Sequence, residues 1–419
     1  MPRPTRRTLL RSAGATAAAA AVPATIVGAS AAPAERTRPV TETTPAENSS
    51  AAPTPAEREQ RARAAADALL THFRAETDPD MLIERTPRQE GDPEFTYVWP
   101  LSQARAAVTE MMAGLKDSSA YAAADAALRR AQEQYWYPQG GTTGLPGYTA
   151  ATDSAQGAHG DFFYDDNDWI ALLEIEQHLV TDGREGDLER TGQLLDLFRS
   201  GESTDPTLAS PGGIEWTQGD WNFDRNTVST FPSAKVALRW HQLTGESTAL
   251  EDAQRWMAWG RDTLLAPNGL YWDNIKPDGD IDRTHWAYNQ GVPLGCEVLA
   301  YEITGDKAHR ERALDLIEAI LAHYRPFDED SPLDDQPLQF TAIMLSNMLL
   351  AESVLGARAK GRAITEAFAD RLWTQRRDPA TDLVRGRETD VGTHLLDQSG
   401  FARTLALAAL PRPLWRHLT

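Results

Sequence analysis

Apolar residues recur three and four positions apart along most of the chain, which is the period of helices that bury one face. No stretch of the sequence alternates apolar and polar residues for long enough to indicate a sheet strand. The pattern therefore predicts an all-α protein of twelve helices. Their predicted spans are 56–76, 99–115, 118–136, 167–180, 186–200, 229–243, 247–265, 289–303, 307–324, 336–355, 359–376 and 394–410.

The connections between these helices alternate between short and long. Three of the short ones, at 181–183, 244–246 and 304–306, share a Thr, a Gly and an acidic residue, and they recur about every 60 residues. A unit of that length with two helices indicates an internal repeat. Six such hairpins closing into a ring form an (α/α)6 barrel. An open helical solenoid is the alternative that the sequence leaves open.

The long connections hold most of the aromatic, Gly, Asp and Asn residues outside the helices. Alternate loops of an up-and-down helical array emerge on the same face, so we expect all of them at one end of the fold. Function tends to lie on loops that a rigid scaffold holds, and the sequence therefore predicts a site on this face. The loops span 77–98, 137–166, 201–228, 266–288, 325–335 and 377–393.

The N-terminus carries an export pattern. Arg6 and Arg7 precede an Ala-rich, weakly apolar stretch, and a small-x-small pattern ends at Ala31. This predicts a twin-arginine signal peptide over 1–31, which is removed, and a secreted or extracytoplasmic protein. A disordered basic tail is the other interpretation.

The segment 32–56 is rich in Ala, Pro and Thr and has almost nothing to bury, which predicts a disordered linker. The remaining residues, 57–419, have no second linker, so we expect one catalytic domain. The single cysteine, Cys296, excludes an intramolecular disulfide.

The charge of the chain limits its partners. Its formal net charge is -20, and loss of the predicted signal, which has four arginines and no acid, leaves -24. Such a chain should repel nucleic acid, anionic membranes and polyuronates. We expect a neutral or cationic polysaccharide substrate, no membrane contact after signal cleavage, and a monomer. Twelve tryptophans fit this expectation, because flat aromatic faces bind the C–H faces of sugars, although they also suit a core.

The sharpest local feature is the run from Phe162 to Trp169, in which three acids and an Asn stand between aromatic residues. Capping of the predicted helix 167–180 explains one acid but not the set. Hydrolysis of a glycosidic bond needs two carboxyl groups, one as proton donor and one as nucleophile or base. We therefore predict Asp165 and Asp166 as a catalytic pair at a bend before the helix.

No metal or cofactor is expected. The sequence lacks a His-x-x-x-His motif, a cysteine pair and a phosphate-binding Gly loop. The acidic run 278–282 faintly suggests a calcium loop but lacks the Glu at the twelfth position, so a turn explains it better.

Several short motifs follow one another from roughly 160 to 400. They are Tyr164-Asp165-Asp166-Asn167, Gly212-Gly213-Ile214-x-Trp216, Arg225-Asn226-Thr227, Gly269-Leu270-Tyr271-Trp272-Asp273, Tyr288-Asn289-Gln290-Gly291 and Leu395-Leu396-Asp397-Gln398. In this order they resemble glycoside hydrolase family 76, the endo-α-1,6-mannanases. The resemblance implies an (α/α)6 barrel and a retaining mechanism, with Asp165 as nucleophile and Asp166 as general acid/base.

Residues of these motifs, together with Trp99, are also candidates for substrate binding, with loop packing or helix capping as the plainer interpretation of each. They are Tyr164, Asn167, Trp99, Trp216, Arg225, Asn226, Trp272, Asp273, Tyr288, Asn289 and Gln290. Two features depart from the family pattern. Asp168 stands where a small residue is usual, which would add a third negative charge, and 335–341 lacks a Phe-Lys-Gly that members often carry.

Other functions stay open at this point. A sugar epimerase on a similar barrel would need two facing histidines, for which His159 and His285 are the candidates. A uronide hydrolase would need basic residues on the active face. A non-catalytic glycan-binding protein would bind sugar without cutting it, and a transglycosylase would pass the covalent intermediate to a sugar.

Overall fold

The computed structural model describes residues 52–115, 118–386 and 391–419. One compact unit spans Pro55–Thr419. The predicted signal 1–31 and all but the last residues of the predicted linker lie outside the described residues.

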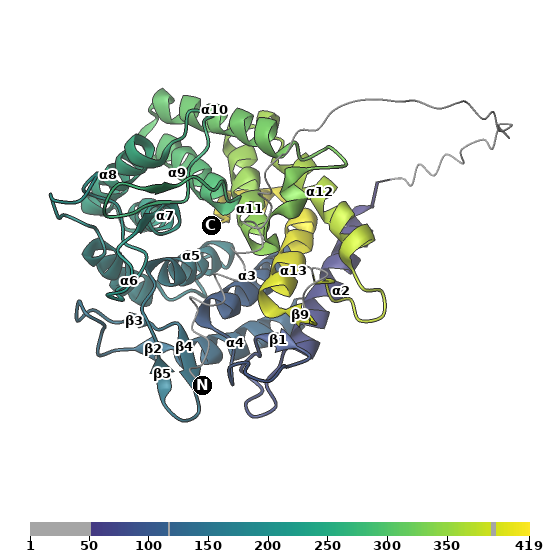
Figure 1. Ribbon diagram of the computed structural model, residues 1–419. Coiled ribbons are helices and arrows are strands. Elements are labelled where there is room, and N and C mark those ends of the chain that lie inside the picture. The colour runs from purple at the N-terminus through teal and green to yellow at the C-terminus, as the bar shows by residue number, and fades with distance from the viewer. Residues whose placement is uncertain (1–51, 116–117, 387–390) are drawn as a thin grey trace, which may run out of the picture. The chain divides into compact units, whose positions relative to one another are not determined.

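The described residues form twelve α-helices, close to the predicted spans (Figure 1). The largest difference is in α12, which ends at Arg371 and continues as a π-helical turn over Leu372–Arg376. The helices are α2 (Pro55–His72), α3 (Val98–Gly114), α4 (Ser119–Glu133), α5 (Tyr164–Val180), α6 (Leu188–Ser200), α7 (Thr227–Thr244), α8 (Ser247–Leu264), α9 (Tyr288–Thr304), α10 (Lys307–Tyr324), α11 (Leu338–Leu355), α12 (Gly361–Arg371) and α13 (Leu395–Ala409).

Six helices form a closed inner ring. In the order α3, α5, α7, α9, α11 and α13, each packs on the next, and α13 packs back on α3 (Figure 1). An open solenoid would leave its first and last helices apart, so the ring closure confirms the (α/α)6 barrel. Five outer helices each follow an inner helix after a short turn. The sixth outer helix, α2, packs on α13, so the two ends of the described chain complete the barrel.

The inner and outer helices differ in sequence because they are buried to different extents. In α3 every residue from Val98 to Met111 is buried, because an inner helix is covered on all sides. In the outer helix α8 only one stripe is buried, with Ala249, Ala253, Trp256 and Leu264 at helical spacing. Inner helix α11 is long and apolar enough to span a membrane by composition alone, but 83% of that window is buried inside the barrel.

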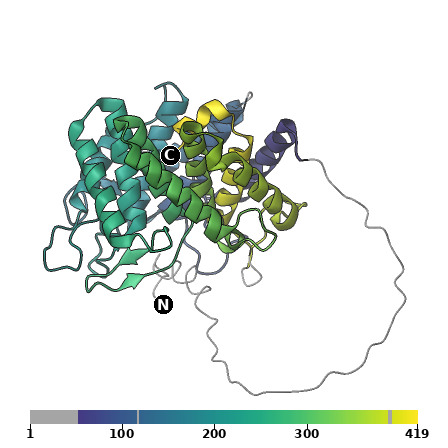
Figure 2. The ribbon, with the colours of Figure 1, turned by 90° about the horizontal axis from the view of Figure 1, so that it is seen from above.

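The long loops gather at the N-terminal ends of the inner helices, and Figure 2 shows short strands at this end. We call this end the loop face. The strands are two or three residues long, which is too short for an alternating pattern to be recognised in the sequence. The antiparallel pairs are β1 (Arg85–Thr86) with β9 (Thr393–His394), β2 (Trp136–Tyr137) with β3 (Gly147–Tyr148), β4 (Ala151–Asp153) with β5 (Gly157–His159), and the three-stranded β6 (Arg225–Asn226), β7 (Asn274–Ile275) and β8 (Ile281–Asp282).

The opposite end of the barrel is covered by the last described residues. The 3-10 helix η4 (Arg412–His417) packs on α11 and α5. Beyond it, the backbone N–H and hydroxyl of Thr419 both donate to Glu176 Oε2, at 3.0 and 2.8 Å, and Arg239 donates to the Leu418 carbonyl at 2.9 Å. The barrel is therefore closed at this end and carries its long loops at the other.

Candidate active site

Asp165 and Asp166 lie in the first turn of α5, with 4% and 1% of their surfaces exposed. Helix α5 begins at Tyr164, three residues before the predicted start, so the expected bend before the helix is wrong. The pair is not a cap either, because Phe163 holds the N-cap position. Adjacent residues of an α-helix point about 100° apart, so the two carboxyl groups face different directions. The positive end of the helix favours negative charge at these positions.

A short antiparallel contact fixes where α5 begins. The backbone N–H of Tyr164 donates to the Trp216 carbonyl at 3.0 Å, and that of Gln218 donates to the Phe162 carbonyl at 3.0 Å. Phe163 packs its ring on Trp216 with centroids 5.0 Å apart. The loop after α6 thus holds the chain extended up to the residue that precedes the helix.

Asp273 is a third carboxyl group at the site. Its two oxygens accept hydrogen bonds from the side-chain amides of Asn289 and Asn274, at 2.9 and 3.1 Å. Burial, then the negative charges of Asp282 and Asp165, raise the pKa of Asp273 to about 7. The effect of Asp165 on this pKa shows that the Asp273 carboxyl lies near the catalytic pair.

Four buried amide oxygens on the loop face have no hydrogen-bond partner among the described residues: Asn226 Oδ1, Asn274 Oδ1, Asn289 Oδ1 and Gln339 Oε1. They come from the starts of α7, α9 and α11 and from β7, where pairing places Asn226 opposite Asn274. A buried polar atom without a partner costs free energy unless a ligand or water satisfies it. We call Asp273 and these four residues the amide cradle. Its acceptors suit a ligand that is rich in hydroxyl groups.

A row of aromatic side chains crosses the mouth of the barrel. Tyr288 stacks on Phe340 with centroids 3.8 Å apart and an interplanar angle of 6°. Trp169 lies on one side of this pair, 6.5 Å from Tyr288, and Trp99 lies on the other, 5.9 Å from Phe340. These residues come from α5, α9, α11 and α3, so the row links four inner helices and provides an apolar floor.

Trp216 and Trp272 lie half-buried in the loops around this floor. Trp216 packs against Trp221 at 5.7 Å, beside the start of α5. Trp272 lies next to the cradle residue Asp273, and the Arg283 guanidinium lies 5.4 Å from its ring. Both keep exposed surface on the loop face, as a sugar platform requires.

Several predicted contact residues are instead bonded to the loops. Both amide hydrogens of Asn167 donate to backbone carbonyls, those of Tyr148 and Phe163, at 3.0 and 2.8 Å. The Gln290 amide holds Tyr271 through its backbone N–H and carbonyl, at 2.7 and 2.9 Å. Arg225 donates to the carbonyls of residues 209 and 210 at 2.9 and 3.0 Å. This bonding gives all three side chains a supporting position behind the site.

Tyr164 belongs with this supporting group. Its ring is buried against Gly201, where an added Cβ would come within 2.5 Å of it. Burial raises the pKa of its hydroxyl above the ordinary value.

Asp168, the predicted third acid beside the pair, lies one turn inside α5. It is fully buried, and its Oδ1 accepts a hydrogen bond from the Ser233 hydroxyl at 2.8 Å. Burial, reinforced by the charge of Asp165, raises the pKa of Asp168 well above its ordinary value. This environment disfavours the negative charge that the sequence predicted.

The sequence analysis missed Asn274, Gln339 and Phe340. Asn274 directly follows the Asp273 motif, and the other two lie in the segment that departs from the family pattern. The two candidate histidines do not form a pair: His159 bonds the Gly157 carbonyl at 2.9 Å, whereas His285 packs edge-on against His323.

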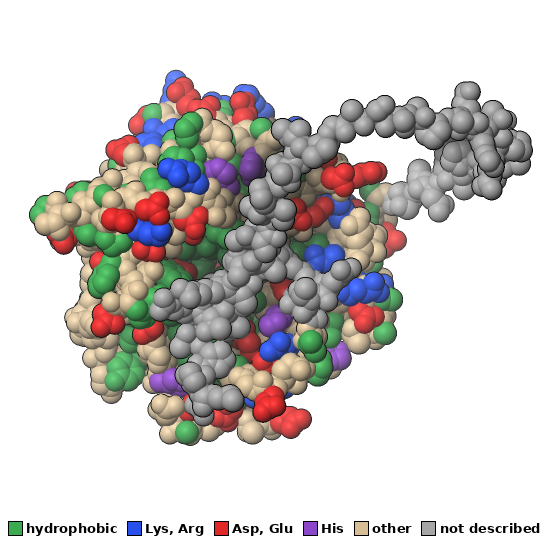
Figure 3. All heavy atoms as spheres, viewed as in Figure 1, with side chains coloured by type: hydrophobic (Ala, Val, Ile, Leu, Met, Phe, Trp, Pro, Cys, Tyr) green, Lys and Arg blue, Asp and Glu red, His purple; other side chains and the backbone are tan. Residues whose placement is uncertain are grey.

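Among the described residues, no group of three or more His, Cys, Asp or Glu side chains is placed to hold a metal. On the face viewed in Figure 3, acidic side chains are interspersed with basic ones.

The family model described as "Glycosyl hydrolase family 76" matches residues 58–358. The chain belongs to this family. The match begins in α2 and ends in the turn after α11, and so includes Asp165, Asp166 and the amide cradle.

Curated relatives match a shorter segment. The mannan endo-1,6-alpha-mannosidase DCW1 of Saccharomyces cerevisiae is 29% identical over 117 residues, which are 26% of this chain and 26% of the yeast protein. The chain thus aligns with about a quarter of the length of this relative.

Solved structures share the fold over most of the chain. The family 76 mannosidase Bt3792 of Bacteroides thetaiotaomicron has a TM-score of 0.71 at 20% identity, covering 84% of this chain and 98% of that one. An inactive α-1,6-mannanase variant of Salegentibacter sp., in complex with α-1,6-mannotriose, has a TM-score of 0.66 at 18% identity, covering 84% and 99%. Two adjacent aspartates are replaced by asparagine in that variant.

Proposed function

We propose that this protein is an exported, retaining glycoside hydrolase that cleaves α-mannosidic linkages, namely the α-1,6 bonds of a mannan. The observation that carries the proposal is the adjacent pair Asp165 and Asp166 in the first turn of α5, beside a cradle of hydroxyl acceptors. The curated relatives are named as endo-1,6-alpha-mannosidases, and a mannanase of the same fold is inactive without two adjacent aspartates. Both facts support the proposal.

The reaction runs as a double displacement. Asp165 attacks the anomeric carbon while the bond from that carbon to the leaving oxygen breaks and Asp166 gives its proton to that oxygen. Asp166, now a carboxylate, then takes a proton from water, and the water oxygen attacks the anomeric carbon. The bond to Asp165 breaks, and the product keeps the configuration of the substrate.

The amide cradle orients the sugar for this attack. Its four unpartnered oxygens and the carboxyl of Asp273 accept hydrogen bonds from hydroxyl groups, which are the donors that a mannose ring presents. Holding the ring in one orientation lowers the barrier, because the reacting atoms are then already aligned. The net charge of the chain agrees with a neutral glycan.

The test is digestion of linear α-1,6-mannan by the mature protein, with an Asp165→Asn/Asp166→Asn variant as control. We expect short manno-oligosaccharides from the parent alone, and proton NMR of the first product should show the α-anomer. An inverted anomer would overturn the nucleophile assignment. If neither protein cuts, the substrate assignment is wrong.

A further inference from the structure

A cavity of about 430 Å³ opens on the loop face, between the hairpins β2–β3 and β4–β5 and the segment 218–219. Its volume is that of a small-ligand site. No sequence motif or comparison assigned it a role. The polar and aromatic residues that line it are Tyr137, Thr142, Thr149, His159, Asp161, Phe162 and Gln218.

The cavity adjoins the catalytic pair through shared backbone. Phe162 and Gln218 line it, and hydrogen bonds join the 162–164 segment to 216–218 at 3.0 Å. The chain then enters α5, so that Asp165 is three residues from Phe162, or at most about 10 Å between Cα atoms. The lining of the cavity is therefore continuous along the chain with the residues that carry the catalytic pair.

The lining of the cavity matches one class of ligand. Tyr137 packs edge-on against Phe162 with centroids 6.1 Å apart and keeps part of its ring exposed, which suits the C–H face of a sugar. Asp161, His159 and Gln218 supply hydrogen-bonding groups. None of the lining residues is Lys or Arg, which disfavours phosphate or uronate ligands.

The walls are formed before any ligand binds. The Gln218 amide oxygen accepts a hydrogen bond from the Thr142 backbone N–H at 2.8 Å, and the Trp221 indole N–H donates to Asp161 Oδ2 at 2.9 Å. Gly141 permits this approach, since an added Cβ would come within 2.1 Å of Gln218 Oε1. A cavity that is already shaped binds without ordering its loops first.

We infer that this cavity binds a single neutral hexose, carried as a side branch on the glycan whose backbone lies across Asp165 and Asp166. The inference rests on the proposed glycosidase function and adds a preference to it. A branched mannan then makes more contacts than a linear one, and the protein favours the branched chain.

The test is a variant in which a larger side chain fills the cavity. Ala158 lines it and is half-buried, so Ala158→Trp places a large ring in the space of the branch. Ala155→Trp is the matched control, because Ala155 is exposed at the turn of the same hairpin and does not line the cavity. We expect Ala158→Trp to lower kcat/KM on mannan with single mannosyl branches about tenfold, because the branch loses the contacts of one sugar ring and one or two hydrogen bonds. The kcat/KM on linear mannan should not change. The control should change neither.

A binding measurement separates this inference from the proposed function. In the Asp165→Asn/Asp166→Asn background, calorimetry with branched and linear manno-oligosaccharides of equal backbone length should show tighter binding of the branched one, and Ala158→Trp should abolish that advantage. Equal affinities, or an advantage that survives Ala158→Trp, would overturn the inference. If the parent hydrolyses neither mannan, the proposed function fails, and the binding comparison still decides the role of the cavity.

Discussion

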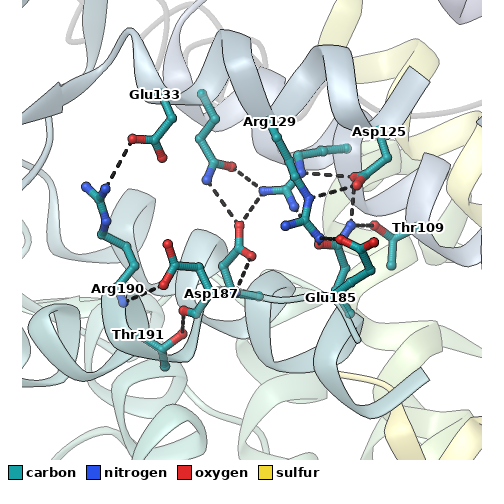
Figure 4. A network of polar contacts seen from close by, with 12 residues as sticks. Thr109, Asp125, Arg129, Glu133, Glu185, Asp187, Arg190 and Thr191 are labelled. Carbon is teal, nitrogen blue, oxygen red and sulfur yellow. Dashed lines mark hydrogen bonds and ion pairs between the residues drawn. The ribbon is translucent and has the colours of Figure 1, made fainter. Parts of the chain in front are cut away.

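Helix α5 carries buried polar side chains toward both of its ends, and the two groups are satisfied in different ways. In its C-terminal half, Glu174 and Gln177 accept hydrogen bonds from the buried guanidinium of Arg105, at 2.5 and 2.7 Å. The same guanidinium donates to Asp125 and Gln132, at 3.1 and 2.8 Å. Every polar atom of these five side chains that is fully buried has a partner within the protein. Figure 4 shows Asp125, Thr109 and Arg129 within the surrounding network.

Toward its N-terminal end, the same helix presents Asp165 and Asp166 to the amide cradle, whose four oxygens lack partners among the described residues. Each unsatisfied oxygen costs about 1–3 kcal/mol, whereas the Arg105 network avoids that cost. One region is therefore built for stability, and the other holds polar atoms ready for a ligand. Variants in the two regions should separate stability from activity.

The largest effect should come from the catalytic pair itself. Asp165→Asn removes the nucleophile, so we expect kcat on mannan to fall about 1,000-fold or more, while the melting temperature stays near that of the parent. Asp166→Asn should retain activity on aryl mannosides with activated leaving groups, because such groups leave without a proton. Steady-state kinetics on both substrates and differential scanning fluorimetry measure these changes.

The contrast between the two variants is the control for this prediction. Equal loss of activity on the aryl mannoside would argue against the separate roles of Asp165 and Asp166. A large drop in melting temperature in either variant would instead place the pair with the stabilising network.

The next effect is on stability alone. Arg105→Met leaves the carboxylate of Glu174 buried without its cation and leaves Asp125 with Arg129 alone, so we expect the free energy of unfolding to fall by about 3–5 kcal/mol. The control is Arg255→Met, which removes exposed ion pairs to Glu202 and Asp252 and should cost at most about 1 kcal/mol. Urea unfolding of both variants measures the difference, and similar losses in the two would contradict the proposed role of the network.

The fold could be predicted because paired helices produce a pattern of apolar positions and loop lengths that repeats along the sequence. Short turns, most of them with Gly, alternate with long loops, and each inner helix is buried on all sides over most of its length. Ring closure needs long-range contacts that no local pattern encodes, such as the packing of α13 on α2 and α3. The short strands could not be predicted for a similar reason, since β1 pairs with β9, which is far away in the sequence.

The candidate site was predictable only in part. Asp165 and Asp166 were found because two adjacent acids between aromatics are unusual. The same composition argument could not tell a contact residue from a supporting one, because Asn167 and Gln290 are as polar as Asn289. Only their hydrogen bonds distinguish the two roles. The amides of Asn167 and Gln290 bond to backbone groups, whereas the amide oxygen of Asn289 has no partner among the described residues.

A smaller effect should follow the ionisation of Asp273, which is only half-buried. Its pKa is raised to about 7 from an ordinary value of 3.8, so between these pH values the unfolded chain releases its proton while the folded chain keeps it. The stability contributed by this group is therefore present at low pH and is lost as the pH rises toward 7. Asp282 and Asp165, whose charges help to raise this pKa, are present in both the parent and the Asp273→Asn variant.

The Asp273→Asn variant isolates this contribution. We expect its stability relative to the parent to rise between about pH 4 and pH 7 and then to stay constant. Thermal melts of both proteins across this range measure the difference. A constant difference at all pH values would show that Asp273 does not titrate as the geometry implies.

The smallest effects give the most direct comparison of the two regions, because one substitution can be made in both. Gln339 in the cradle and Gln177 in the network are both buried, but Gln339 Oε1 has no partner, whereas Gln177 bonds Arg105, Thr109 and Asp125.

Replacement of either glutamine by Met keeps the size of the side chain and removes its polar atoms. At Gln339 this relieves an unsatisfied acceptor, so the protein should gain about 1 kcal/mol in unfolding free energy and lose kcat/KM on mannan. At Gln177 it removes the partner of those three groups and of Arg129, which also donates to Gln177, so stability should fall by about 1–3 kcal/mol with kcat/KM unchanged. Stability changes of the same sign at both positions would mean that the cradle oxygens are not held ready for a ligand.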